Sequence, residues 1–580
     1  MSMPADTIRS QSSNITTLDQ LGEHSDYSYI RLLNADPQAT PDGRDHRARQ
    51  VFSGHYVPVK PTPIASPQYI THSETFFKEL GLDDSLATDE GFIRLFSGDM
   101  TSLPDTMKST GWATGYALSI YGTEYVQQCP FHTGNGYGDG RAISVVEAVL
   151  NDKRWEMQLK GAGPTPYCRG ADGRAVLRSS VREFLAQELM HALGVPTSRS
   201  LTLYTSLSER VDRPWYYPDS QSTDPEIMVS NPVAISTRVA PSFIRVGQIE
   251  LFARRARSNE HPTAHHELQQ IVEHLITREY SNDIDLSLPL TEQVVELAKH
   301  FQSRLINLVS NWLRVGFCQG NFNSDNCAAG GFTLDYGPFG FCELFEPAFQ
   351  PWTGGGRHFS FFNQPAAAQK NYEMFCKSLR VLLEGLNVDA EASNDSLQAL
   401  EVIEDNFSNN MEQQLNAMWA QKLGLAKYDT DLFVELITLM ANTGVDYTIF
   451  FRELSSLPNE LSDLDNSFYR QPPEDLLDRW NTWLAKWQQA IKLSELNDHQ
   501  CDIIKQNMQK VNPKYTWREW RVVPAYQNAE NGQYGLIHEL QELFATPYKE
   551  GTAAQNEKYY TLRPQQYLFA GGVSHYSCSS

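Results

Sequence analysis

The sequence is poor in cysteine, in positive charge and in long apolar runs, and each shortage excludes a class of protein. Its eight cysteines in 580 residues include no CxxC pair, which argues against a zinc ribbon or a disulfide scaffold and favours a reducing compartment. Its 48 basic residues against 70 acidic ones give a net charge of -22, so we expect no general nucleic-acid or anionic-membrane surface. Any phosphate site must therefore be local.

Apolar stretches are short as well. The longest apolar helical pattern, LINLVSNWLRVGF, contains Asn311 and Arg314 and is too short to cross a membrane. Residues 1–30 carry Asp and Glu and lack the apolar core of a signal peptide. We therefore expect a soluble cytoplasmic protein, or a mitochondrial one if the source is eukaryotic. The oligomeric state stays open, and a monomer is compatible with the sequence.

The remaining composition, 41% hydrophobic and 20% charged, is that of a large globular protein. Residues 1–50 are polar and rich in turn formers, so we expect a loosely attached arm. Over 51–246, apolar runs between turn residues predict strands around one helix, and over 247–547 apolar positions at three-to-four spacing predict helices. Residues 548–580 form a C-terminal tail. The expected fold class is α+β, with a β-rich first half.

The strands are expected at RWEMQLKG, SRSLTLYTS and NPVAISTRVA, and the helix at RSSVREFLAQELMHALG. Ser179 or Ser180 can cap the start of this helix, and Gly194 ends it. Residues 207–230 are rich in Pro, Ser and Asp, which predicts an inserted surface loop.

Glycine and positive charge gather in one part of this β-rich half. GNGYGDGRA, LKGAG and RGADGR are glycine-rich, and tight hairpin turns would explain either region taken alone. From Gln158 to Arg182, however, five basic residues meet a single acid, Asp172, which is a local excess of +4. This excess predicts an anion site. The five are Lys160, Arg169, Arg174, Arg178 and Arg182.

Further polar residues follow in the order used by protein kinases. Lys160 ends a predicted strand and Glu183 lies early on the next helix, like the kinase pair that holds ATP phosphates, although two solvated charges would explain the pair too. Asp325 and Asn326 lie in a polar loop, and Asp335 begins a DYG tripeptide. Carboxylate and amide oxygens suit Mg²⁺. Each short motif alone is a common turn, but the ordered set predicts a nucleotide site.

Two arginines, Arg238 and Arg245, lie seven residues apart where the strands give way to helices. Guanidinium groups there could bind phosphate with paired donors, and an exposed salt bridge is the alternative. Their position at the junction favours phosphate binding.

Several long motifs follow one another along the chain: GDGRAIS, QLKGAGPTPY, GRAVLRSSVREFL, TRVAPSFIRVG, SDN, LDYGPFGF and NPKYTWREW. In these motifs the chain resembles the selenoprotein O family, from about Val51 to its C-terminus. The resemblance implies a protein-kinase-like bilobal fold, with an N-lobe over 51–246 and a C-lobe over 247–547. It also implies that the protein binds ATP in a flipped orientation and transfers AMP to Ser, Thr or Tyr hydroxyls of proteins. A protein kinase and a non-catalytic nucleotide-binding scaffold remain alternatives.

The resemblance further implies roles for individual residues. Asp325 becomes the proton acceptor, Lys160 pairs with Glu183, and Asn326 and Asp335 become ligands of Mg²⁺, with Mn²⁺ as the alternative. The implied nucleotide-binding positions are Gly138, Gly140, Arg141, Lys160, Asp172, Gly173, Arg238, Arg245 and Asp335.

The chain departs from the family pattern in two places. Gln319 stands where the family commonly has a histidine, but Asp325 and Asn326 are retained, so we expect activity. Cys578 occupies the third-last position, where family members carry selenocysteine or cysteine, which implies redox control through a second cysteine. An unpaired tail thiol is an equal alternative, since Gln350 occupies the expected partner position and Cys342 is the nearest substitute.

Overall fold

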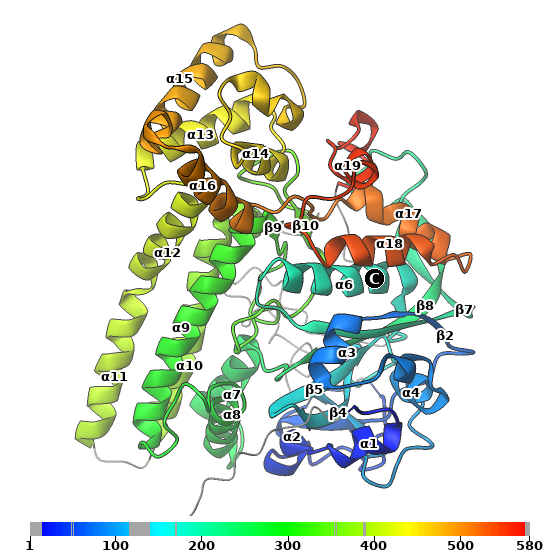
Figure 1. Ribbon diagram of the computed structural model, residues 1–580. Coiled ribbons are helices and arrows are strands. Elements are labelled where there is room, and N and C mark those ends of the chain that lie inside the picture. The colour runs from blue at the N-terminus through cyan, green and yellow to red at the C-terminus, as the bar shows by residue number, and fades with distance from the viewer. Residues whose placement is uncertain are drawn as a thin grey trace, which may run out of the picture.

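The computed structural model in Figure 1 places a strand-rich half beside a helical half. It describes residues 14–47, 49, 51–114, 140–168, 171–352, 354, 356–386 and 390–574.

One antiparallel sheet occupies the first half. In the described residues its order is β1-β3-β4-β5-β8-β7-β2, with β6 paired to β8. Asn151 and Asp152 adopt positive φ angles of 50° and 61° between β4 and β5, as a two-residue hairpin turn requires. The strands are β1 Tyr56–Val59, β2 Gln68–His72, β3 Gly111–Thr114, β4 Ala142–Leu150, β5 Lys153–Lys160, β6 Ala175–Val176, β7 Arg199–Trp215 and β8 Ile227–Ala240.

Strands β7 and β8 extend into the segment that was expected to be a surface loop. They pair from Arg210 with Pro232 to Trp215 with Ile227, so only the tip of residues 207–230 is a loop. Partly buried and exposed side chains alternate along this part of β7. The polar residues that suggested a loop form the solvent face of a two-stranded ribbon, which explains the difference.

Residues 14–47 also differ from the loosely attached arm expected over 1–50. They contain α1 (Leu18–Glu23) and α2 (Ser28–Leu32), both beside β4 in Figure 1. Leu21 and Tyr29 are fully buried, and the backbone N–H of Asp26 donates to the carbonyl of Glu147 on β4. A few apolar residues in a polar segment are therefore enough to attach it.

Helix α6 (Leu177–Ala192) packs against the sheet and carries Glu183. It begins at Leu177, two residues before the predicted serine caps, because strand β6 leads directly into it and Val176 is the N-cap. Gly194, with φ 73°, follows its end as predicted. Two further helices of this half are α3 (Glu74–Leu80) and α4 (Glu90–Phe96).

The second half is helical, as predicted, and its long helix α9 leads to the site. α9 ends at Gly316, where φ is 82°, and a short hairpin of β9 (Phe317–Cys318) and β10 (Gly340–Phe341) encloses the polar loop that follows. The helices are α7 Val246–Ser258, α8 Ala264–Glu279, α9 Leu290–Val315, α10 Gln364–Gly385, α11 Ala390–Asp405, α12 Phe407–Lys422, α13 Thr430–Thr443, α14 Tyr447–Leu454, α15 Glu474–Ala490 and α16 Asp498–Val511.

The chain then returns to the first half. Helices α17 (Glu519–Ala529) and α18 (Gly535–Phe544) pack against α6, and α19 (Ala553–Tyr559) follows them (Figure 1). None of the described helices is both long enough and apolar enough to cross a membrane.

Candidate functional site

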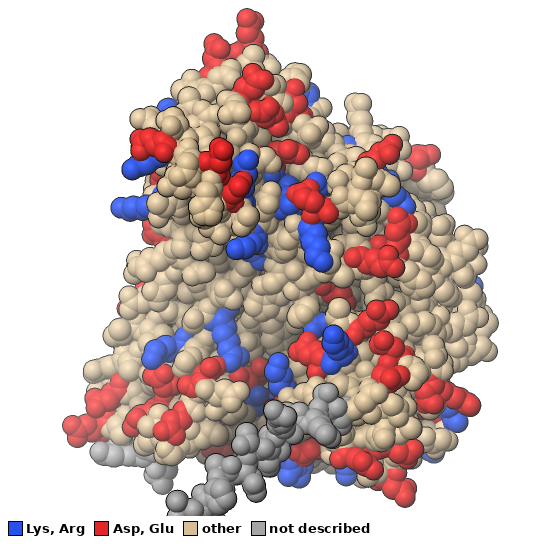
Figure 2. Space-filling model, in the orientation of Figure 1, with Lys and Arg blue, Asp and Glu red and all other residues tan. Residues whose placement is uncertain are grey.

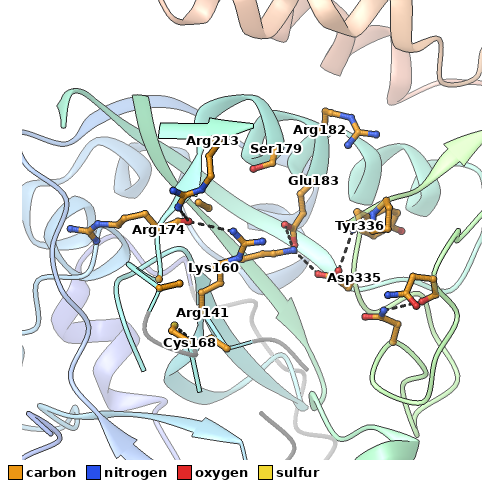
Figure 3. A pocket seen from close by; sticks show the side chains of 18 of the residues that line it. Arg141, Lys160, Cys168, Arg174, Ser179, Arg182, Glu183, Arg213, Asp335 and Tyr336 are labelled. Atoms are coloured by element: carbon orange, nitrogen blue, oxygen red, sulfur yellow. Dashed lines mark hydrogen bonds and ion pairs between the residues drawn. The ribbon is translucent and has the colours of Figure 1, made fainter. Parts of the chain in front are cut away.

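A cavity of about 700 Å³ lies between the sheet, α6 and the loops around β9 and β10 (Figure 3). Acidic and basic side chains interleave over the face of the protein in Figure 2, and both kinds also line the cavity. Most of the predicted site residues line the cavity: Gly140, Arg141, Lys160, Asp172, Gly173, Glu183, Asp325, Asn326 and Asp335.

Lys160 lies at the centre of this site, at the end of β5. Its Nζ is 2.8 Å from Oε2 of Glu183 on α6 and 2.6 Å from Oδ1 of Asp335, so one ammonium group joins two carboxylates (Figure 3). Burial raises the pKa of Glu183, as does the charge of Asp335, while Lys160 and Arg238 oppose the rise. The predicted Lys160–Glu183 pair is therefore present, and it is buried.

Arg238 and Arg245 are placed differently from the other predicted residues. Neither lines the cavity. Arg238 on β8 is 0% exposed, and its Nη1 lies 2.7 Å from Oδ1 of Asp335 and 3.5 Å from Oε1 of Glu183. Arg245 is the buried N-cap of α7, and its backbone bridges to Ala328. Both arginines are thus buried outside the cavity lining, and Arg238 contacts two carboxylates that line it.

The loop after β9 brings Asp325 and Asn326 to the cavity. Asn326 Nδ2 donates to the carbonyl of Asn321 at 2.9 Å, which fixes the amide orientation. Gln319, the departure from the family pattern, donates from Nε2 to the carbonyl of Asp335 at 3.0 Å. Gln319 thus connects this loop to the DYG segment through a hydrogen bond.

Glycine is required by close backbone approach at two predicted positions. A Cβ on Gly140 would lie 2.5 Å from the carbonyl oxygen of Tyr167, and one on Gly173, where φ is 67°, would lie 2.0 Å from that of Gly163. The predicted Gly138 lies outside the described residues.

Asp172 is held by a residue that was not predicted, Arg213 of the β7–β8 ribbon. Arg213 donates from Nη1 and Nη2 to the Asp172 carboxylate at 3.0 and 2.6 Å, and it lines the cavity. Burial opposes the effect, but these hydrogen bonds lower the pKa of Asp172. Sequence reasoning missed Arg213 because its segment was expected to be a loop, and the sequence LSERVDRPW does not alternate strictly between polar and apolar residues.

Three of the arginines counted around the glycine-rich stretch have structural partners, and a fourth, Arg169, lies outside the described residues. Arg174 pairs with Glu209 at 2.7 Å, Arg178 lies over the Trp215 ring at 3.9 Å, and Arg182 pairs with Glu519 at 3.0 Å. Carboxylates therefore neutralise Arg174 and Arg182, and Lys160 is paired with Glu183 and Asp335 at the centre of the cavity.

Comparison with known proteins decides the family. The family described as "Protein adenylyltransferase SelO" matches residues 45–545. The chain belongs to this family. The resemblance, the α+β kinase-like fold and the enzymatic class, a protein adenylyltransferase, are confirmed.

Relatives match over nearly their whole length. The chain is 34% identical over 570 residues to "Protein nucleotidyltransferase YdiU" of Aromatoleum aromaticum, covering 96% of this chain and 99% of that protein. It is 34% identical over 566 residues to the protein of that name from an Azoarcus species, with the same coverage. It is 32% identical over 561 residues to that of Flavobacterium johnsoniae, covering 94% and 98%.

The site has oxygen donors that fit a hard divalent cation. Asn326 and Asp335 line the same cavity and offer an amide oxygen and a carboxylate, the ligand types that Mg²⁺ prefers. Within the described residues no cluster of three or more His, Cys, Asp or Glu forms a separate metal site. Two protein ligands would leave further positions to phosphate oxygens and water.

The predicted redox thiol, Cys578, lies outside the described residues. Its suggested partner, Cys342, is 1% exposed, and burial raises the pKa of its thiol. A disulfide between these residues would require local opening around Cys342.

Proposed function

We propose that this protein transfers AMP from ATP to Ser, Thr or Tyr hydroxyls of other proteins. The observation that carries the proposal is the convergence of Lys160, Glu183, Asp325, Asn326 and Asp335 on one cavity. This is the set expected for nucleotide chemistry, and family membership favours adenylyl transfer over phosphoryl transfer.

The nucleotide-binding role is assigned to the basic residues and glycine-rich turns that line the cavity. Lys160 and Arg141 supply cations for phosphate oxygens, and the Asp172–Gly173 turn lets the ligand approach the backbone. Asn326 and Asp335 would hold the metal, Mg²⁺ or Mn²⁺, which when bound would neutralise phosphate charge.

Asp325 is the proposed proton acceptor. The hydroxyl oxygen of the target protein forms a bond to the α-phosphorus, the bond from that phosphorus to the α–β bridging oxygen breaks, and pyrophosphate leaves. The hydroxyl proton passes to the Asp325 carboxylate. Lys160 stabilises negative charge that develops on the phosphate oxygens.

The test uses ATP labelled at either the α or the γ phosphate. AMP transfer predicts that protein acquires the α label only, with release of pyrophosphate. Transfer of the γ label alone would establish the kinase alternative and refute the proposal. Nucleotide binding with neither label transferred would establish the scaffold alternative. Mass spectrometry of the labelled proteins would identify the modified hydroxyls.

A further inference from the structure

A short segment near the C-terminus is buried beside the site without lining the cavity. Trp517, Arg518, Glu519 and Trp520 are each 5% exposed or less. They belong to the NPKYTWREW motif, and Glu519 lies 337 residues after its partner Arg182. The proposed chemistry gives this segment no role.

Glu519 is ion-paired with Arg182 on α6. Arg182 Nε lies 3.0 Å from Glu519 Oε1, and its Nη2 donates to the Phe339 carbonyl at 3.2 Å. Trp517 Nε1 donates to Glu519 Oε2 at 2.7 Å. Both partners of the ion pair are less than 10% exposed. The pair is therefore shielded from water, and the attraction between its charges is stronger there than it would be in water.

Arg182 directly precedes Glu183, the residue that contacts Lys160. Successive side chains on a helix point about 100° apart. Figure 3 shows Arg182 and Glu183 leaving α6 in different directions. One helical turn is thus held by two ion pairs on different sides, so α6 cannot rotate without breaking at least one of them.

The residues on either side of Glu519 attach the segment to Glu343 and Asp446 of the helical half. Arg518 donates to Asp446 at 2.5 and 3.0 Å and to Glu343 at 3.0 Å, and Trp520 Nε1 also donates to Glu343 at 3.0 Å. Although burial opposes it, the charges of Arg563 and Arg518 lower the pKa of Glu343. Glu343 is therefore ionised, and its carboxylate accepts hydrogen bonds from Arg518 and Trp520 of this segment.

We propose that Glu519 is a positioning residue for AMP transfer, which holds α6 through Arg182 so that Glu183 remains on Lys160. The proposal rests on the proposed function. The segment connects the helical half to α6, so the orientation of Glu183 depends on a residue that touches neither nucleotide nor target. Loss of the Glu519 charge leaves the packing of α6 in place but removes one of the two ion pairs that hold the turn of Glu183.

Direct contact between Arg182 and the nucleotide is the competing explanation, because Arg182 also lines the cavity. The two explanations differ in kinetics. Loss of a direct contact raises KM for ATP and is independent of Glu183. If Glu519 positions Glu183, its substitution lowers kcat. The same substitution then has no effect on kcat in a protein whose residue 183 can no longer pair with Lys160.

The experiment is a double-mutant cycle in the full-length chain, read as kcat and KM for transfer of the α label. We expect Glu519→Gln to lower kcat about tenfold with KM for ATP changed less than about threefold. In a Glu183→Gln background the same substitution should cause no further loss. Full activity of Glu519→Gln, or an equal loss in both backgrounds, would overturn the proposal.

Glu539→Gln is the matched control, because Glu539 on α18 pairs with Lys558 at 2.7 Å and both side chains are 42% exposed. It should retain wild-type kinetics. If thermal unfolding shows that Glu519→Gln does not fold, Glu519→Asp keeps the charge on a shorter side chain. Glu519→Asp should lower kcat less than Glu519→Gln does, and it should lower kcat no further in the Glu183→Gln background. A loss of kcat that persists in that background contradicts the positioning role. A wild-type protein that transfers no α label contradicts the proposed function itself.

Discussion

Arg238 Nη1 lies 2.7 Å from Asp335 Oδ1, and this contact joins the sheet of the first half to the DYG segment of the second. Removing one partner of a buried ion pair costs about 3–5 kcal/mol. We therefore expect Arg238→Met to lower AMP transfer by about 100-fold and to lower Tm. Initial rates with α-labelled ATP and thermal unfolding measure both effects.

Arg238→Lys separates charge from geometry. Lysine keeps the positive charge but loses the hydrogen bond from Arg238 Nε to Gln158 at 2.8 Å. Its rate should lie between those of the wild type and Arg238→Met. A wild-type rate in Arg238→Met would show that the position of Asp335 does not depend on Arg238.

Much of this site follows from local sequence, because each residue lies on or next to an apolar element that the sequence predicts. Lys160 ends a strand, Glu183 lies on the helix that follows it, and Asp325 and Asp335 lie in the loop between β9 and β10. The order of these elements sufficed to predict that they meet. Predicting that Arg238 lies outside the cavity lining would have required the register of β8 with β5, which composition does not determine.

Other parts could not be predicted, for a different reason. Arg182 and Glu519 are 337 residues apart, and no local pattern pairs one helix residue with a distant carboxylate. Arg213 lies in a ribbon with a polar solvent face, which resembles a loop in composition. Likewise, Leu21 and Tyr29 show their burial only once the sheet is present.

Substitution of Lys160 or Asp335 by alanine should abolish AMP transfer, with a loss of about 100-fold or more, because both groups act electrostatically on the bound nucleotide. Circular dichroism should show that both variants fold. Lys486→Ala is the control for removing a lysine, since Lys486 pairs with Glu435 at 2.7 Å and its side chain is 54% exposed. Wild-type rates in Lys160→Ala or Asp335→Ala would show that the site is misplaced.

Arg213→Gln should weaken nucleotide binding more than catalysis. Without Arg213, the Asp172–Gly173 turn loses the two hydrogen bonds that hold it against the cavity. We expect KM for ATP to rise about tenfold with kcat within about threefold. Arg210→Gln is the control: Arg210 lies on the same strand but hydrogen-bonds to Ser230 and does not line the cavity. Equal kinetics in the two variants would contradict a role for Arg213 in binding.

Glu156, on the same strand as Lys160, should make stability depend on pH. Burial raises its pKa to about 7, although Arg278 and a hydrogen bond from Ser144 oppose the rise. Between the ordinary value of 4.5 and about 7, the folded protein holds a proton that the unfolded chain has lost. Stability should therefore fall as pH rises through this window, by roughly 3 kcal/mol at most, and then level off.

Glu156→Gln isolates this contribution, because glutamine keeps the shape of the side chain and cannot ionise. Groups that titrate in both proteins cancel in the comparison, so Tm should fall less between pH 5 and pH 8, about the limits of that window, in the variant than in the wild type. Glu539→Gln, at an exposed ion pair, should follow the wild type. An identical fall of Tm in Glu156→Gln and wild type would mean that Glu156 is ionised in the folded protein across the whole range, with Arg278 as its counterion at 3.6 Å.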